Sequence, residues 1–220
     1  MEKKMKHHTL RHCLWLLVLL FYTLTPIETP ATSNSNPQPY NPLARSPVHI
    51  MVVYYLHTGN TEQMARGVIE GTKRVSGVVT MLKEVSKVTK KDLETADGII
   101  LGCPTYFANI PGKMKVIIDD WNWKMKVDFT DKVGGAFGTA GGQVGGQGHV
   151  VVSLLLFMLN NRMIVAGPLY RNEVTGSVWG ESGAAAITGP LDPGVGKGEL
   201  DGAQRLGERV ARLTIKMKGS

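Results

Sequence analysis

The sequence predicts a doubly wound α/β fold, with a five-stranded parallel sheet between helices. Short apolar runs rich in β-branched residues alternate along the chain with segments of helical periodicity, an order typical of parallel sheets. The 220 residues are 43% hydrophobic and 20% charged, and this composition excludes a disordered or collagen-like chain. Because the only cysteines are Cys13 and Cys103, a disulfide-dense secreted scaffold is excluded as well.

Five segments are predicted as strands from their apolar, β-branched composition. The first of them, residues 48–55, is apolar almost throughout, as expected of a strand that is buried on both faces. The five predicted strands are residues 48–55, 78–85, 98–103, 132–137 and 163–166.

Helical periodicity marks the segments between these strands. In residues 61–74, Met64 and Val68 fall on one side of a helix while charged residues surround the rest, and the last segment of the chain has the same amphipathic pattern. The predicted helices are residues 61–74, 92–96, 113–121, 150–160 and 199–217.

The first 47 residues differ in composition from the rest. Four basic residues precede the apolar run 13–24, which is typical of an export signal. The run is about half the roughly 20 residues that a membrane-spanning helix needs, which favours a cleavable signal peptide over a signal anchor. The predicted organisation is a signal peptide or signal anchor at 1–31, a tether rich in Pro, Ser and Asn at 32–47, and one domain at 48–219.

This N-terminal segment decides the expected location of the protein. Its basic end precedes the apolar run, so the positive-inside rule would send the domain to the periplasmic or extracellular side. A start codon further downstream would instead leave the domain in the cytoplasm. Membrane contact is expected only through the N-terminal segment.

The positive charge is distributed without a pattern that suggests nucleic-acid binding. The chain carries a net charge of +7 at pH 7, and removal of residues 1–31, with four basic and two acidic residues, leaves about +5. The remaining lysines and arginines form no basic stripe. We therefore expect no nucleic-acid partner.

A polar loop at residues 56–61 follows the first predicted strand and suits a phosphate. Hydroxyls of Thr58 and Thr61, backbone N–H groups freed at Gly59 and Asn60, and a helix N-terminus converge there. No lysine follows the glycine, so the loop differs from that of nucleoside triphosphatases, and it lacks the spacing of a dinucleotide site. An ordinary helix cap is the alternative interpretation.

Two more loops follow the third and fourth predicted strands. Residues 104–111 bring aromatic side chains to a place where a flat ring could stack. Residues 139–147 are rich in glycine, which is useful where the main chain lies close to a ligand. Because ligands of doubly wound sheets bind beyond the carboxyl ends of the strands, the three loops predict one binding site.

Three motifs make the sequence recognisable. They are Y-Y-x-x-T-G-N-T-E-x-M-A at 54–65, A-D-G-I-I-L-G-x-P-T-Y-F at 96–107, and K-V-G-G-A-F at 132–137 followed by G-G-Q-x-G-G-Q. In this order they resemble the flavodoxin-like FMN proteins, and more narrowly the NAD(P)H:quinone oxidoreductases of the tryptophan-repressor-binding-protein type. The resemblance covers residues 48–219.

The resemblance implies bound FMN, with its phosphate on residues 56–61 and its isoalloxazine ring between residues 105–107 and 139–146. It implies NADH or NADPH as electron donor, a quinone or similar small electron acceptor, and a homo-oligomer. The flavin would carry the chemistry, so no catalytic side chain and no metal are expected. The implied cofactor-binding residues are Leu56, His57, Thr58, Gly59, Asn60, Thr61, Pro104, Thr105, Tyr106, Phe107, Asn109, Thr139, Ala140, Gly141, Gly142, Gly145 and Gly146.

Two other functions stay open at this point. The first is a non-enzymatic electron carrier in the manner of flavodoxin, although such carriers are usually strongly acidic. The second is a flavin-fold binding protein with weak or no FMN, because a hydroxyl residue is usual where Leu56 stands.

A few further residues are expected to have structural rather than catalytic roles. We expect Cys103 to be a small core residue, His57 to face solvent, and the acidic pair at 119–120 to form local hydrogen bonds or ion pairs rather than to act in catalysis. For Trp121 and Trp123 two interpretations stay open, a rim near the flavin or a cover over the end of a helix.

Overall fold

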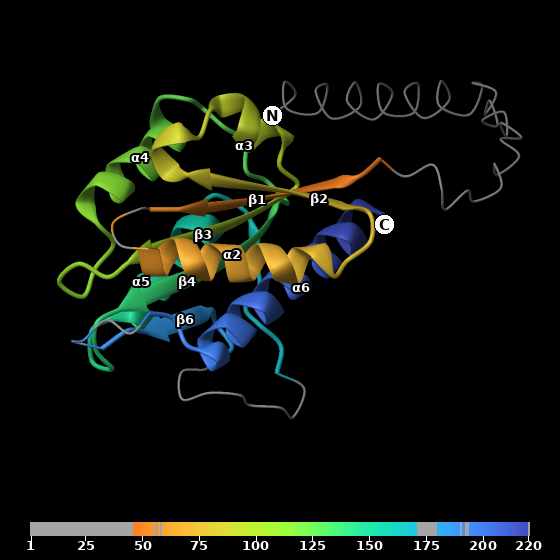
Figure 1. Ribbon diagram of the computed structural model, residues 1–220. Coiled ribbons are helices and arrows are strands. Elements are labelled where there is room, and N and C mark those ends of the chain that lie inside the picture. Colours follow the sequence, from red (N-terminus) through yellow and green to blue (C-terminus); the bar gives the residue numbers. More distant parts are fainter. Residues whose placement is uncertain are drawn as a thin grey trace, which may run out of the picture. The chain divides into compact units, whose positions relative to one another are not determined.

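The part of the chain that the structure describes forms a parallel sheet with helices on both faces (Figure 1). The computed structural model describes residues 46–55, 57, 59–170, 180–189, 191 and 194–219. The predicted signal segment and nearly all of the predicted tether lie outside the described residues. All elements discussed below belong to one unit, residues 45–220.

The sheet has the strand order β2-β1-β3-β4-β5, and β6 pairs with β4 beyond the end of β5. Every pairing is parallel, as the alternation of strand and helix predicts. This confirms the α/β class and the doubly wound sheet. The strands are β1 (Val48–Tyr54), β2 (Val78–Glu84), β3 (Gly98–Pro104), β4 (Val133–Ala140), β5 (Ile164–Val165) and β6 (Ala184–Ile187).

The helices cover the two faces of the sheet as separate layers, each with its own apolar core. On one face, Ile50 and Val52 of β1 pack with α2 and α6, which Figure 1 shows together on the same side. On the other, Met51 and Val53 pack with α4 and α5. The helices are α2 (Gly59–Lys73), a 3-10 turn η2 (Val85–Lys87), α3 (Lys90–Thr95), α4 (Gly112–Trp123), α5 (Gln147–Asn160) and α6 (Lys197–Lys218).

None of the helices in the described part of the chain is both long enough and apolar enough to cross a membrane.

The fifth position of the sheet differs from the prediction. Instead of one strand at residues 163–166, the chain forms a two-residue β5, leaves the sheet, and returns as β6, which the sequence did not predict. Val133 and Gly134 of β4 pair with β5, whereas residues 137–140 pair with β6. The two segments therefore fill one position of the sheet, side by side with β4. Because β6 is short and consists mainly of alanine, its composition did not identify it as a strand.

All five predicted helices begin one to three residues earlier than predicted, and the largest difference, at α5, follows from the backbone geometry of the preceding loop. The helix predicted at residues 150–160 begins at Gln147, directly after Gly146, whose φ of 94° lies in the left-handed region that favours glycine. The helix predicted at 61–74 begins at Gly59.

The structure also shows where the residues that were expected to have structural roles lie. Cys103 is fully buried, and burial raises the pKa of its thiol to about 12, so its prediction as a core residue is confirmed.

Trp121 is fully buried and Trp123 is 72% exposed, and both belong to the last turn of α4, at the end away from the loop that precedes this helix. Trp121 belongs to the apolar core on this face of the sheet. Asp119 and Asp120 form ion pairs with lysines on the same or the adjoining turn, as predicted.

Candidate functional site

A cavity of about 220 Å³ lies at the carboxyl ends of the central strands, where the fold predicts a ligand. The loops after β1, β3, β4 and β6 all contribute to it. Its lining residues are His57, Asn60, Pro104, Thr105, Tyr106, Thr139, Ala140, Gly141, Thr188 and Gly189.

Eight of these ten lining residues are among the cofactor-binding residues named from the sequence. Thr188 and Gly189 were missed because they follow β6, the strand that was not predicted; their only signal was the T-G-P triplet after the alanine run. Leu56 and Thr58 lie outside the described residues. The predicted residues that surround the cavity without lining it are Gly59, Thr61, Phe107, Asn109, Gly142, Gly145 and Gly146. The assignment of all these residues to FMN stays a prediction.

A buried pair of hydroxyl groups joins two of the predicted loops. The Oγ1 atoms of Thr61, in the first turn of α2, and Thr139, near the end of β4, lie 2.9 Å apart. Thr61 is fully buried, and Thr139 nearly so. One hydroxyl donates to the other, so one proton of the pair stays available for an acceptor. The Thr61 hydroxyl, which the sequence assigned to a phosphate, therefore also fixes the helix N-terminus to the sheet.

Aromatic rings form one wall of the cavity. The ring of Tyr106 meets the ring of His57 edge to face, with centroids 5.2 Å apart, and meets Tyr55 in the same way at 6.3 Å. Burial, and then the neighbouring Tyr55, raise the pKa of Tyr106, so its hydroxyl stays protonated at neutral pH. His57 is exposed as predicted, although its side chain also lines the cavity.

The loop after β3 is held in a tight turn. Tyr106 and Asn109 exchange two backbone hydrogen bonds, each 2.9 Å long, and the two residues between them, Phe107 and Ala108, have φ values of 49° and 61°. These left-handed conformations cost a non-glycine residue roughly 1–2 kcal/mol each. The turn leaves the Phe107 side chain fully exposed at its tip.

The loops after β3 and β4 touch each other. A Cβ placed on Gly146 would lie 2.6 Å from the Cα atom of Ala108, which is closer than real Cβ contacts allow. Only glycine therefore permits this approach. The position of the Phe107 turn thus depends directly on the glycine-rich loop.

The residues of the cavity fit FMN in their donor chemistry. The Oγ1 atom of Thr105 is buried and has no hydrogen-bond partner, and a buried polar atom beside a cavity is normally satisfied by something. Around it lie hydroxyls, backbone groups and the N-terminus of α2, which are neutral donors suited to a phosphate. The cavity is smaller than the roughly 300–1,000 Å³ of sites that enclose a ligand, so part of a flavin would stay at the surface.

The described residues include no group of three or more His, Cys, Asp or Glu side chains placed to hold a metal ion.

Comparison with known proteins decides the family. The flavodoxin of Aquifex aeolicus (strain VF5) is 32% identical over 162 residues, which cover 74% of this chain and 84% of that protein. The chain belongs to the flavodoxin family. In addition, residues 83–174 match the family model described as NADPH-dependent FMN reductase.

Other flavodoxin relatives carry enzyme names. The NAD(P)H dehydrogenase (quinone) of Geotalea daltonii is 29% identical over 202 residues, covering 76% of this chain and 97% of that protein. The enzyme of the same name from Geobacter metallireducens is also 29% identical, over 204 residues, with coverage of 77% and 99%. These matches confirm the resemblance to quinone reductases of the tryptophan-repressor-binding-protein type.

Solved structures agree on the flavodoxin fold. The flavodoxin, WrbA-like protein of Agrobacterium tumefaciens superimposes with a TM-score of 0.60 at 23% identity, covering 77% of this chain and 99% of that one.

Proposed function

We propose that the protein is an FMN-dependent oxidoreductase that takes electrons from NADH or NADPH and passes them to a quinone or a similar small acceptor. The observation that carries the proposal is the cavity at the carboxyl edge of the sheet, with neutral donors and the unpartnered Oγ1 atom of Thr105. The matches to an FMN reductase model and to proteins named NAD(P)H dehydrogenase (quinone) support it.

Each loop has a distinct role in this function. The N-terminus of α2 and the hydroxyls near it hold the phosphate, and the Thr61–Thr139 hydrogen bond keeps that helix end against the sheet. The Oγ1 atom of Thr105 gains a hydrogen-bond partner from the cofactor. The contact between Gly146 and Ala108 fixes the spacing of the two loops beside the ring. When bound, FMN supplies hydride acceptance and two-electron transfer.

The mouth of the site favours an apolar acceptor. Phe107 and Val144, near the tips of the two touching loops, are both fully exposed. Apolar side chains exposed on loops beside a ligand cavity would offer contact to an apolar acceptor. A flat quinone ring meets that description better than a charged acceptor does.

The proposal is tested with the purified chain. We expect it to be yellow or to take up FMN on titration, to lose the flavin colour when mixed anaerobically with NADH or NADPH, and to regain it when a soluble benzoquinone is added. A protein that binds no FMN would overturn the proposal. Bound flavin that neither nicotinamide bleaches would overturn the reductase activity alone.

A second candidate is an electron carrier, favoured by the 32% identity to a protein named flavodoxin. In that case neither NADH nor NADPH would reduce the flavin directly, whereas a separate reductase protein would. The net positive charge argues against this role, because carriers of this kind are usually strongly acidic.

We also propose that the domain is exported or anchored through its N-terminal segment. N-terminal sequencing of the protein from its native host tests this. A mature protein that begins near residue 32 supports cleavage, an intact N-terminus found in the membrane fraction supports an anchor, and an N-terminus downstream of residue 13 in the cytosol would contradict both.

A further inference from the structure

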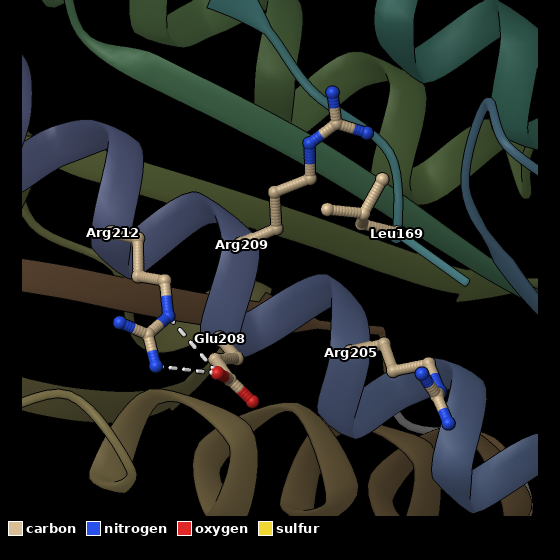
Figure 2. A pocket seen from close by; sticks show the side chains of 5 residues that line it. All are labelled: Leu169, Arg205, Glu208, Arg209 and Arg212. Atoms are coloured by element: carbon tan, nitrogen blue, oxygen red, sulfur yellow. Dashed lines mark hydrogen bonds and ion pairs between the residues drawn. The ribbon is translucent and has the colours of Figure 1, made fainter. Parts of the chain in front are cut away.

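A second cavity, of about 310 Å³, lies between α6 and the segment that leaves β5 (Figure 2). It is separate from the flavin site, because β5 pairs with the first two residues of β4 whereas the flavin cavity lies beyond the last ones. Arginine side chains dominate it. Its lining residues are Leu169, Arg205, Glu208, Arg209 and Arg212.

Arg209 is held in place by the main chain rather than by an acid. Its Nη1 atom donates to the carbonyl oxygens of Gly167 and Pro168, each at 3.2 Å, and Figure 2 shows the side chain extending from α6 toward Leu169. Within the described part of the chain, Arg209 forms no ion pair with a carboxylate. A guanidinium group has five N–H donors, so further donors stay available on a side chain that is already ordered.

Two carboxylates accompany the arginines in the described part of the cavity and its surroundings. Arg212 donates twice to one oxygen of Glu208, at 3.0 and 2.8 Å, and this hydrogen bond holds the pKa of Glu208 below its usual value. The second oxygen of Glu208 lies 3.6 Å from Arg74 of α2. Arg205 pairs with Asp201 at 2.6 Å. With Arg209 included, the described residues in and beside the cavity carry four guanidinium groups and two carboxylates.

The arginines also have a regular arrangement. Positions 205, 209 and 212 follow the i, i+4, i+7 spacing of one helix side, so they span about 10 Å along the axis of α6. A cavity lined in this way offers planar donors to more than one anionic group. Phosphate matches guanidinium geometry well, since two parallel N–H donors can reach two of its oxygens.

We propose that this cavity is a binding site for phosphate groups, independent of the flavin site. The ligand is a small phosphorylated molecule or an anionic lipid headgroup, because either one presents the same phosphate oxygens to the arginines. Bound phosphate would accept hydrogen bonds from Arg209 and connect α6 to the segment that leaves β5.

The experiment uses the full chain with excess FMN, so that the phosphate part of the flavin site is filled. Isothermal titration with inorganic phosphate and with pyrophosphate, at constant ionic strength set by chloride, measures binding. We expect a dissociation constant below about 1 mM for at least one of the two. Arg209→Gln should weaken binding at least about tenfold. Cosedimentation with phosphatidic acid and phosphatidylcholine vesicles then separates a lipid headgroup from a free phosphate compound.

Two further variants keep the test decisive. Arg212→Gln is a second variant of the cavity, chosen in case loss of the Arg209 contacts unfolds the protein, and it should also weaken binding. Arg162→Gln is the matched control, because Arg162 pairs with Asp128 outside the cavity and is 70% exposed. The proposal is overturned if neither phosphate probe nor phosphatidic acid binds, or if Arg162→Gln weakens binding as much as the cavity variants do.

Discussion

The side chains of Thr61 and Thr139 meet through a hydrogen bond between their hydroxyl oxygens, 2.9 Å long and buried from solvent. The two residues are 78 positions apart in the sequence. This bond ties the first turn of α2 to the end of β4, and both of these elements contribute to the cavity. The relative position of the phosphate loop and the glycine-rich loop therefore depends on one pair of hydroxyls.

A double-mutant cycle on this pair tests that dependence. Thr61→Val and Thr139→Val each leave the remaining hydroxyl buried without a partner, so each should lower the free energy of unfolding by about 1–3 kcal/mol. The double variant should cost less than the sum, because it leaves no orphaned hydroxyl. Urea denaturation measures all four proteins. Strictly additive effects would show that the bond contributes little.

Gly146→Ala should separate the two loops that touch. The new Cβ would lie 2.6 Å from Ala108 and would sit on a backbone with φ of 94°, so we expect FMN to bind at least about tenfold more weakly. The control is Gly148→Ala in the first turn of α5, where a Cβ meets nothing within 4 Å. Fluorescence titration with FMN compares them. Equal affinity of the two variants would contradict the role of the contact.

Leu56→Ser tests the position of the phosphate. A serine would supply the hydroxyl that the family resemblance leads us to expect there, and one more hydrogen bond to a charged group should tighten FMN binding about tenfold. Leu56→Ala removes the same side chain without adding a donor, so it serves as the control. If the serine variant binds FMN no more tightly than the alanine variant, the phosphate lies elsewhere.

Acid should remove the stabilisation that Asp92 provides. Hydrogen bonds from Lys83 and then from Thr89 lower the pKa of Asp92 from 3.8 to about 2. Because the pKa is lower in the folded state, this stabilisation is complete above about pH 4 and is lost as the pH falls toward 2.

The size of this effect follows from comparison with Asp92→Asn, which carries no charge at any pH. At pH 7 the wild-type protein should be about 1 kcal/mol more stable than the variant, a value that allows for solvent screening. The difference in the free energy of unfolding should shrink as the pH falls from about 4 to 2, between the unfolded pKa of 3.8 and the folded pKa of about 2. A constant difference would show that the charge of Asp92 contributes nothing.

Cys103 should resist alkylation in the native protein. Burial raises the pKa of its thiol to about 12, so only about one molecule in ten thousand carries the reactive thiolate at pH 8. Peptide mapping after treatment with iodoacetamide should find Cys103 unmodified in the native protein and modified in urea. Equal modification in both states would contradict its place in the core.

The part of the fold that could be predicted from the sequence is the part that local patterns determine. Residues 48–55 and 98–103 were recognised because a strand buried on both faces must be apolar throughout. By contrast, β6 consists of three alanines and one isoleucine, and Ala184 and Ala186 are buried in the core on the α6 side of the sheet. Pairing through the backbone and packing under a helix leave little trace in the local sequence.

The same distinction holds at the candidate site. The loops after β1, β3 and β4 were predicted because each carries turn residues directly after a strand. Thr188 and Gly189 were not, since their strand was missed. The hydrogen bond between Thr61 and Thr139 could not have been predicted, because it depends on how α2 docks against the sheet.

The way β4 pairs with its last neighbours also shows where the long connection meets the sheet. Gly134 pairs with Val165 and Phe137 pairs with Ala184, so two residues of β4 separate the pairings. Ala166, whose N–H donates to Gly134, and Gly183, beside the carbonyl of Ala136, stand opposite those two residues. Joining Ala166 directly to Gly183 would therefore give one unbroken strand without changing a single pairing. The connection between Ala166 and Gly183 thus lies at a point where a change in its length leaves the register of the sheet intact.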